Sequence, residues 1–402
     1  MLNIRIIYIC CLILTFASCK MKDEITCYGG SDSDLVQLLE KEGYTLKFYP
    51  SVSEALQNAP EKSGVLLLSD SYPVKGTSIS QEDESLIEAK SLRVLVEFPQ
   101  RIGTTDSSKS DTLNLERIVV CDSINTELPF MSLLSFNRCI LKETSDSINH
   151  PILVAAKVAG FDKAVYGLKD TETRPVLYYR TPHLLVSTTC ISHFASDRYM
   201  PEQKIKSLYE YIFRWLLSKN TVTFSSWITY ITPSYTPSDV LPENAGYESI
   251  KKGIEWFYNG HFLVNSEWKQ NWVDKYMGDG TMPIGPSIPD QFQNGDGSLG
   301  VLEGHMSEIR YDGSQLYRYW MRADVQGEAS YAFAAAGDLL ENNEYSKVAT
   351  NLIDYSFKEY RDSERNDPAS PSYGLLGWAY THKGTYYGDD NARFLLGVIA
   401  SS

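Results

Sequence analysis

The chain of 402 residues lacks the residue spacings that usually identify a metal site. Its seven cysteines form no Cys-x-x-Cys pair, and His261, His305 and His382 stand apart from one another, so no zinc-ligand spacing is present. A Walker A sequence is also missing. We therefore expect no cofactor and no essential metal, and we expect the cysteines of the folded chain to be buried thiols.

Basic charge is scarce as well. The chain has 37 Lys and Arg against 51 Asp and Glu, which gives a formal net charge of −14. Proteins that bind phosphate backbones need clustered basic residues, so we expect no nucleic-acid partner. Neutral glycans tolerate an acidic surface, and the 27 tyrosines and 7 tryptophans supply aromatic faces that can pack against sugar rings. A polysaccharide or oligosaccharide is the expected partner.

A single long apolar run lies near the N-terminus. Residues 6–16 are nearly all apolar, too few to span a bilayer, and they follow the positive charge of Arg5. The sequence Phe16-Ala-Ser-Cys19 then resembles the lipobox of bacterial lipoproteins, in which small residues precede a cysteine that is lipidated and becomes the new N-terminus. We predict a signal peptide at residues 1–18 and lipidation of Cys19. The alternative is an ordinary signal peptide cut near Ala17.

The residues after Cys19 indicate where such a lipoprotein would reside. Residue 20 is lysine, and Lys22-Asp-Glu24 resembles the charged tether of surface-exposed lipoproteins. We expect an outer-membrane or cell-surface location, with membrane contact only through the lipid anchor.

Residues 19–220 alternate short β-rich runs with helical runs. The rhythm predicts an α/β domain with a parallel sheet covered by helices. Such a domain resembles the class I glutamine amidotransferase-like fold over about 190 residues. That resemblance implies a nucleophilic Cys in a Gly-x-Cys-x-Gly turn, but neither Cys121 nor Cys190 has the flanking glycines. We therefore expect a scaffold or a binding module.

Residues 221–244 are predicted to form a linker, and long helical patterns follow it over residues 245–402. The sequences Gly300-Val-Leu-Glu-Gly-His305, Trp320-Met-Arg-Ala-Asp324 and Tyr386-Tyr-Gly-Asp-Asp-Asn-Ala-Arg393 resemble six-hairpin glycosidases. The resemblance implies a multidomain chain that ends in a partial all-α (α/α)6 toroid. About four of the twelve helices of a full toroid are recognisable, so we expect this domain to be incomplete.

Paired carboxyl groups are the candidate catalytic residues, because glycoside hydrolysis uses two of them. Asp389 and Asp390 form the first candidate pair, and Glu303 is the next candidate. Both aspartates could instead sit at the start of a helix, where acidic residues are favoured for structural reasons. The predicted substrate-binding residues are Trp320, Arg322, Asp324, Trp378, Tyr386, Tyr387, Asn391 and Arg393.

Three functions remain open at the level of sequence. The resemblance implies a surface lipoprotein of polysaccharide breakdown that acts as an inverting glycoside hydrolase. Helical toroids also serve polysaccharide lyases, which use a Tyr or His base. A glycan-binding or structural lipoprotein without turnover is the third possibility.

Overall fold

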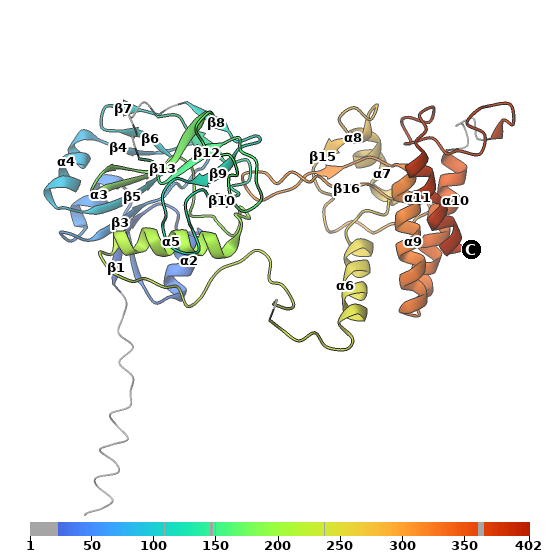
Figure 1. The fold of residues 1–402 in the computed structure, drawn as a ribbon, viewed down its shortest axis with the longest axis horizontal. Coiled ribbons are helices and arrows are strands. Elements are labelled where there is room, and N and C mark those ends of the chain that lie inside the picture. Colours follow the sequence, from blue (N-terminus) through green and yellow to red (C-terminus); the bar gives the residue numbers. More distant parts are fainter. Residues whose placement is uncertain (1–22, 108, 145–147, 149, 237, 361–365) are drawn as a thin grey trace, which may run out of the picture. The chain divides into compact units, whose positions relative to one another are not determined.

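The computed structural model describes residues 23–107, 109–144, 148, 150–236, 238–360 and 366–402. The predicted signal peptide and Cys19 lie outside the described residues. Two compact units make up the rest (Figure 1). The first runs to Thr232 and includes Arg310–Ser314, and the second contains Pro233–Ile309 and Gln315–Ser402.

A nine-stranded sheet forms the centre of the first unit, in the order β10-β9-β12-β13-β14-β5-β3-β1-β2. Five neighbouring strands from β14 to β2 are parallel, and the other four are antiparallel. The strands are β1 (Glu24–Tyr28), β2 (Thr45–Phe48), β3 (Gly64–Leu67), β5 (Arg93–Glu97), β9 (Arg117–Val120), β10 (Leu133–Leu134), β12 (Leu153–Ala156), β13 (Thr173–Thr181) and β14 (Leu184–Ser187).

The predicted parallel sheet is therefore wrong for nearly half of its strands. Parallel neighbours require a long crossover, usually a helix, whereas antiparallel neighbours can be joined directly. After β5 the helical connections stop, and β13 and β14 are joined by only Pro182 and His183. The sheet is mixed because its later strands are linked by turns and loops.

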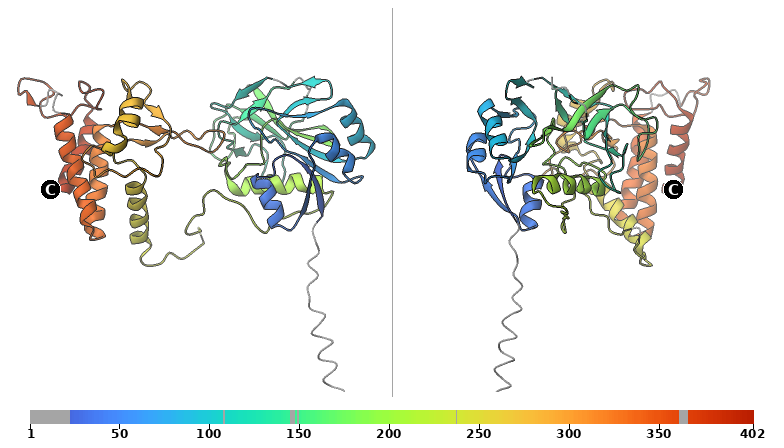
Figure 2. Two further views of the ribbon diagram at one scale, coloured as in Figure 1. Left: turned by 180° about the vertical axis from the view of Figure 1, so that it is seen from behind. Right: turned by 60° about the vertical axis from the view of Figure 1, so that its left-hand side comes forward.

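Helices cover both faces of this sheet (Figures 1 and 2). Side chains alternate along β3, so that Leu66 belongs to the core under α2 and α5, while Val65 and Leu67 belong to the core under α3 and α4. Local caps start two of the helices: the Ser33 hydroxyl accepts from Val36 N, and Ser80 and Asp83 form a capping box. The helices are α2 (Asp34–Lys41), α3 (Val52–Asn58), α4 (Gln81–Ala89) and α5 (Glu202–Leu216).

Smaller sheets flank the main one. One joins β4 (Thr77–Ile79), β6 (Pro99–Ile102) and β7 (Thr105–Asp106), and another pairs β8 (Ser110–Thr112) with β11 (Ile140–Lys142).

The second unit combines helices with a three-stranded antiparallel sheet. In Figure 1 the helices α9, α10 and α11 lie side by side, and their contacts with one another are extensive. The helices are α6 (Ala245–Asn259), α7 (Ser266–Lys269), the π-turn η1 (Gln270–Asp274), α8 (Lys275–Met277), α9 (Ala323–Leu339), α10 (Asn343–Glu359) and α11 (Gly388–Ser401). The strands are β15 (Ile284–Gly285), β16 (Gly304–His305) and β17 (Tyr317–Arg318).

This architecture contradicts the predicted partial all-α toroid. Between α8 and α9 the chain forms loops and the β15-β17-β16 sheet instead of helical hairpins. Over the whole structure helix accounts for 31% and strand for 20%, which describes a mostly α/β protein. The glycine-rich sequence between residues 278 and 322 explains the difference, because glycine disfavours helix and suits loops.

Candidate functional site

Two helices of the second unit run in the same direction and in close contact. A Cβ atom on Gly397 of α11 would lie 2.3 Å from the carbonyl oxygen of Gly327 of α9, so the backbones touch here. One turn further on, the hydroxyls of Ser330 and Ser401 are 2.7 Å apart. This parallel contact brings the first turns of α9 and α11 together, and with them Asp324 and Asp390.

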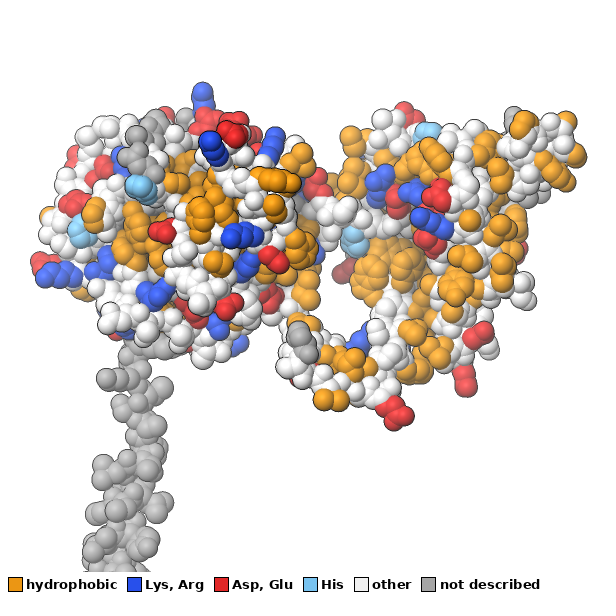
Figure 3. Space-filling view, viewed as in Figure 1, with side chains coloured by type: hydrophobic (Ala, Val, Ile, Leu, Met, Phe, Trp, Pro, Cys, Tyr) orange, Lys and Arg blue, Asp and Glu red, His pale blue; other side chains and the backbone are white. Residues whose placement is uncertain are grey.

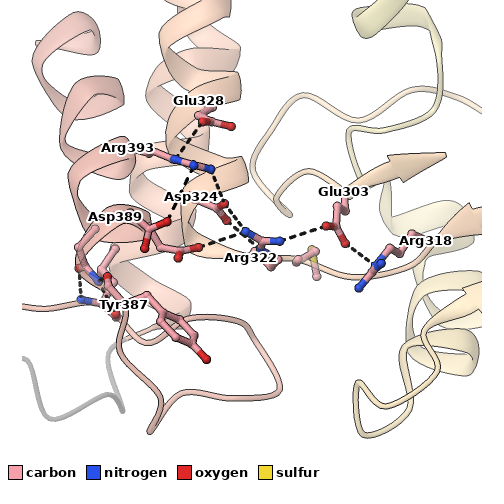
Figure 4. Close-up of polar contacts among 12 residues, drawn as sticks. Glu303, Arg318, Arg322, Asp324, Glu328, Tyr387, Asp389 and Arg393 are labelled. Carbon is pink, nitrogen blue, oxygen red and sulfur yellow. Dashed lines mark hydrogen bonds and ion pairs between the residues drawn. The ribbon is translucent and has the colours of Figure 1, made fainter. Parts of the chain in front are cut away.

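The guanidinium group of Arg322 joins the carboxyl groups at this point. Its Nε donates to Asp324 Oδ1 at 3.1 Å, and its Nη2 contacts both Asp324 Oδ2 and Asp390 Oδ1, the latter at 3.2 Å. Its Nη1 donates to Glu303 Oε1 at 3.2 Å. Figure 4 shows Arg322 lying between Asp324 and Glu303. One side chain thus holds three carboxyl groups, from α9, from α11 and from the loop before β16.

Burial shifts the pKa of Asp390 in this cluster. The side chains of Asp324 and Asp390 are only 3% and 7% exposed. Burial raises the pKa of Asp390, the charge of Asp324 and a hydrogen bond with it raise the pKa further, and Arg322 acts in the opposite direction. The pKa of Asp390 is therefore shifted in the direction that suits a general acid.

A second arginine, Arg393, lies on the solvent side of the cluster. Its guanidinium is half-exposed and approaches Asp324 Oδ2 at 3.6 Å, Glu328 Oε1 at 3.6 Å and Asp389 Oδ2 at 3.8 Å. Asp389 itself is 68% exposed, so this contact is a surface ion pair. The two neighbouring aspartates of the predicted pair consequently point into different environments, and the close partner of Asp390 is Asp324.

Aromatic side chains border the cluster on one side. The rings of Trp320 and Trp378 pack edge to face with centroids 4.8 Å apart, and Tyr387 packs on Trp378 at 5.3 Å. Trp320 is only 5% exposed and its Nε1 donates to Thr381, so its ring packs beneath the site and is not open to a ligand. Trp378 is half-buried and Tyr387 is exposed, so these two could contact a ligand.

Other predicted ligand-binding residues have different surroundings. Asn391 is buried, and its side chain accepts from Leu376 N and donates to Leu376 O and Tyr387 O, so it fastens the preceding loop to α11. Tyr386 is half-buried and lies in the loop just before Tyr387.

Arg318 belongs to the site but was not among the predicted residues. Its Nε lies 2.6 Å from Glu303 Oε2, and its guanidinium lies over the Trp320 ring, 5.0 Å from the centroid. Alternation in an extended chain places Arg318, Trp320 and Arg322 on one side, because they are two residues apart. The sequence shows this spacing of two residues. It was not recognised as an extended segment because helical patterns were predicted over residues 245–402.

A glycine run, Gly295-Asp-Gly297-Ser-Leu-Gly300, has the spacing of a dinucleotide-binding loop. That motif functions between a strand and a helix, whereas this run lies in a loop without either neighbour. A Cβ on Gly295 would lie 2.2 Å from Val264 O, and one on Gly300 would lie 2.5 Å from the Tyr355 ring. Gly295 and Gly300 therefore allow this loop to pack closely against Val264 and Tyr355.

The first unit also contains a buried thiol beside a carboxyl group. Cys190 Sγ lies 3.8 Å from Glu97 Oε2 and 3.4 Å from Ser192 Oγ. Burial raises the pKa of Cys190 well above its usual value, and Glu97 raises it further. A thiol in this state stays protonated and is a poor nucleophile, which argues against amidotransferase-type catalysis by Cys190.

Comparison with known protein families, with characterised proteins and with solved structures found no match. Among the residues that the structure describes, none of the helices combines the length and apolar composition needed to cross a membrane. Within those same described residues, no three His, Cys, Asp or Glu side chains are arranged to hold a metal ion.

Proposed function

We propose that this chain is a surface-anchored lipoprotein of polysaccharide breakdown and that its second unit is a glycoside hydrolase. The observation that carries the proposal is the Asp390 carboxyl group, which is buried beside Asp324, has a raised pKa and shares Arg322 with Glu303. Proton donation by one carboxyl group and activation of water by another are the two tasks of this chemistry.

In the proposed reaction Asp390 protonates the glycosidic oxygen as the bond to the anomeric carbon breaks. Glu303, at 22% exposed, accepts a proton from the attacking water, and the water oxygen forms the new bond. Arg322 contacts both carboxyl groups and fixes their separation. Attack by water on the opposite face inverts the anomeric configuration. Trp378 and Tyr387, whose rings pack against each other, would supply the aromatic surface for the sugar ring.

The Asp390→Asn variant tests this assignment. Asparagine keeps the shape of the side chain but cannot donate the proton, so we expect hydrolysis to fall by about 10²- to 10⁴-fold while glycan binding persists. Release of reducing ends from a panel of neutral polysaccharides measures the first effect, and calorimetry measures the second.

The neighbouring variant Asp389→Asn is the matched control, because Asp389 is exposed and only pairs with Arg393. It should hydrolyse at nearly the wild-type rate. Wild-type turnover by Asp390→Asn would exclude Asp390 as the proton donor.

A non-catalytic glycan-binding protein is the second candidate. It is favoured by the ion pairs that Arg322 and Arg393 make with the carboxyl groups, since ion-paired carboxylates also stabilise a fold. This function predicts glycan binding without release of reducing ends by the wild-type protein.

The lipid anchor is proposed at Cys19 from the resemblance of residues 16–19 to a lipobox. The Cys19→Ala variant should appear in the soluble fraction of the producing cells, because the protein would lose its acyl chains. Fractionation followed by intact mass measures this. Membrane association of the variant at the wild-type level would contradict the proposal.

A further inference from the structure

The first unit contains a cavity of about 740 Å³ where β9 ends and β12 begins. Its base includes Ile152 and Val154, which are 5% and 3% exposed. Tyr179 of β13 and Tyr211 of α5 form part of the wall. Figure 3 shows hydrophobic side chains gathered on the face of this unit that carries α5. The volume lies in the usual range for small-molecule sites, about 300 to 1,000 Å³.

The lining combines aromatic groups with short hydroxyl side chains. The hydroxyls of Tyr179 and Tyr211 are 3.5 Å apart, and Ser123, Thr171 and Thr173 add further hydroxyl groups. Hydroxyl groups both donate and accept hydrogen bonds, so they suit a ligand that also carries hydroxyls. Burial raises the pKa of Tyr179, and its neighbour Tyr211 raises it further, which keeps the phenol protonated as a donor.

The charge of the lining limits the class of ligand. None of the described residues that line the cavity is Lys or Arg, Asp122 contributes a negative charge, and His150 is the one imidazole among them. A phosphate or a uronate would find no permanent positive charge here. The lining therefore fits a neutral polyhydroxylated molecule with one apolar face.

From this lining we infer that the cavity binds a neutral oligosaccharide, in the first unit and apart from the carboxylate cluster of the second. Aromatic faces contact the C–H face of a sugar ring, and the hydroxyl groups satisfy the sugar hydroxyls. The choice of a sugar among neutral polar ligands rests on the proposed function. Such a site would hold a glycan on the protein independently of its hydrolysis.

The test places a bulky side chain in the cavity of the full chain. In the Thr171→Trp variant the indole would occupy space that the sugar needs, while the adjacent Glu172→Trp variant adds the same group at an exposed position outside the lining. The probes are neutral hexasaccharides of glucose, galactose, mannose and xylose, with oligogalacturonate as the acidic comparison. Calorimetry is performed on the Asp390→Asn background, so that no probe is consumed.

We expect at least one neutral hexasaccharide to bind at a site whose affinity falls tenfold or more in Thr171→Trp and is unchanged in Glu172→Trp, separately from the binding at the second unit that the Asp390→Asn background keeps. Circular dichroism must show that both variants are folded. The inference is overturned if no neutral probe binds, if oligogalacturonate binds best, or if Thr171→Trp binds as well as Glu172→Trp does. A failure of the hydrolase proposal would give a different result. The wild-type protein would then bind sugar in this cavity but release no reducing ends from polysaccharides.

Discussion

Asp389 and Asp390 are adjacent in the sequence but differ greatly in environment. Asp389 is 68% exposed, whereas Asp390 is 7% exposed and shares Arg322 with Asp324. The sequence predicted that a carboxylate at this helix start would be important. It could not predict which of the two faces inward, because that depends on a contact with Arg322, which lies 68 residues earlier in the chain.

Arg322 should tolerate no conservative replacement. Its planar group binds Asp324 through two nitrogens and also reaches Glu303 and Asp390, and a lysine ammonium cannot make this set of contacts. We expect Arg322→Lys to lower the free energy of unfolding by roughly 2 to 4 kcal/mol, because buried carboxylates lose hydrogen bonds. Urea unfolding measures the loss.

Arg318→Lys provides the comparison for that variant. Arg318 is 36% exposed and contacts one carboxyl group, so the same replacement should cost less than about 1 kcal/mol. Equal losses in the two variants would show that the multiple contacts of Arg322 add no stability.

The pairing of α9 with α11 depends on the absence of side chains at the contact. A methyl group at Gly397 would collide with Gly327 O, and the helices would have to separate. We expect Gly397→Ala to lower the free energy of unfolding by about 1 to 3 kcal/mol and to reduce hydrolysis, because the Asp324–Asp390 pair would open. Thermal unfolding and the rate of reducing-end release measure the two effects.

Gly253→Ala in α6 is the matched control, since no atom lies near its added methyl group. Alanine favours helix over glycine, so this variant should be as stable as the wild type or more stable by up to about 1 kcal/mol. A stabilising effect of Gly397→Ala as well would mean that the helices are not in contact at this glycine.

At the level of elements, the sequence located most strands and helices of the first unit but not the direction of the later strands. A short, fully buried apolar run marks a strand such as Leu184–Ser187 without saying which neighbour it pairs with. The direction of a strand depends on the length of the connection that precedes it, which the apolar pattern of the strand itself does not show. In the second unit the helices Ala323–Leu339 and Asn343–Glu359 fall within the helical patterns predicted over residues 245–402, whereas two-residue strands such as Tyr317–Arg318 carry almost no periodic signal.

At the scale of the whole molecule, stability should respond to Asp197 in the first unit. Burial raises the pKa of Asp197 to about 8, with the charge of Asp34 as the next cause. The folded chain keeps this proton up to about pH 8, whereas the unfolded chain loses it near pH 4. The protonated Asp197 side chain therefore contributes its full stability below about pH 4. This contribution decreases between pH 4 and pH 8, by at most about 1.4 kcal/mol per pH unit, and is lost once the pH has risen through 8.

The Asp197→Asn variant removes this titration, because asparagine resembles the protonated acid. Between pH 5.5 and 7.5 the wild type should lose roughly 2 kcal/mol more than the variant does. Urea unfolding, monitored through hydrogen exchange of peptides from the first unit, measures the difference. The contributions of the other titrating groups cancel because both proteins contain them. Parallel pH profiles would show that Asp197 is ionised in the folded chain at neutral pH.

The parallel arrangement of α9 and α11 has an electrostatic consequence. Each helix carries a partial positive charge at its N-terminal end, so two parallel helices set like poles side by side. Asp324 lies in the first turn of α9, and its charge offsets their repulsion. The same charge that raises the pKa of Asp390 is thus also a countercharge for this helix pairing. An acidic residue at position 324 would favour the pairing of α9 with α11 even in a relative of this protein without hydrolase activity.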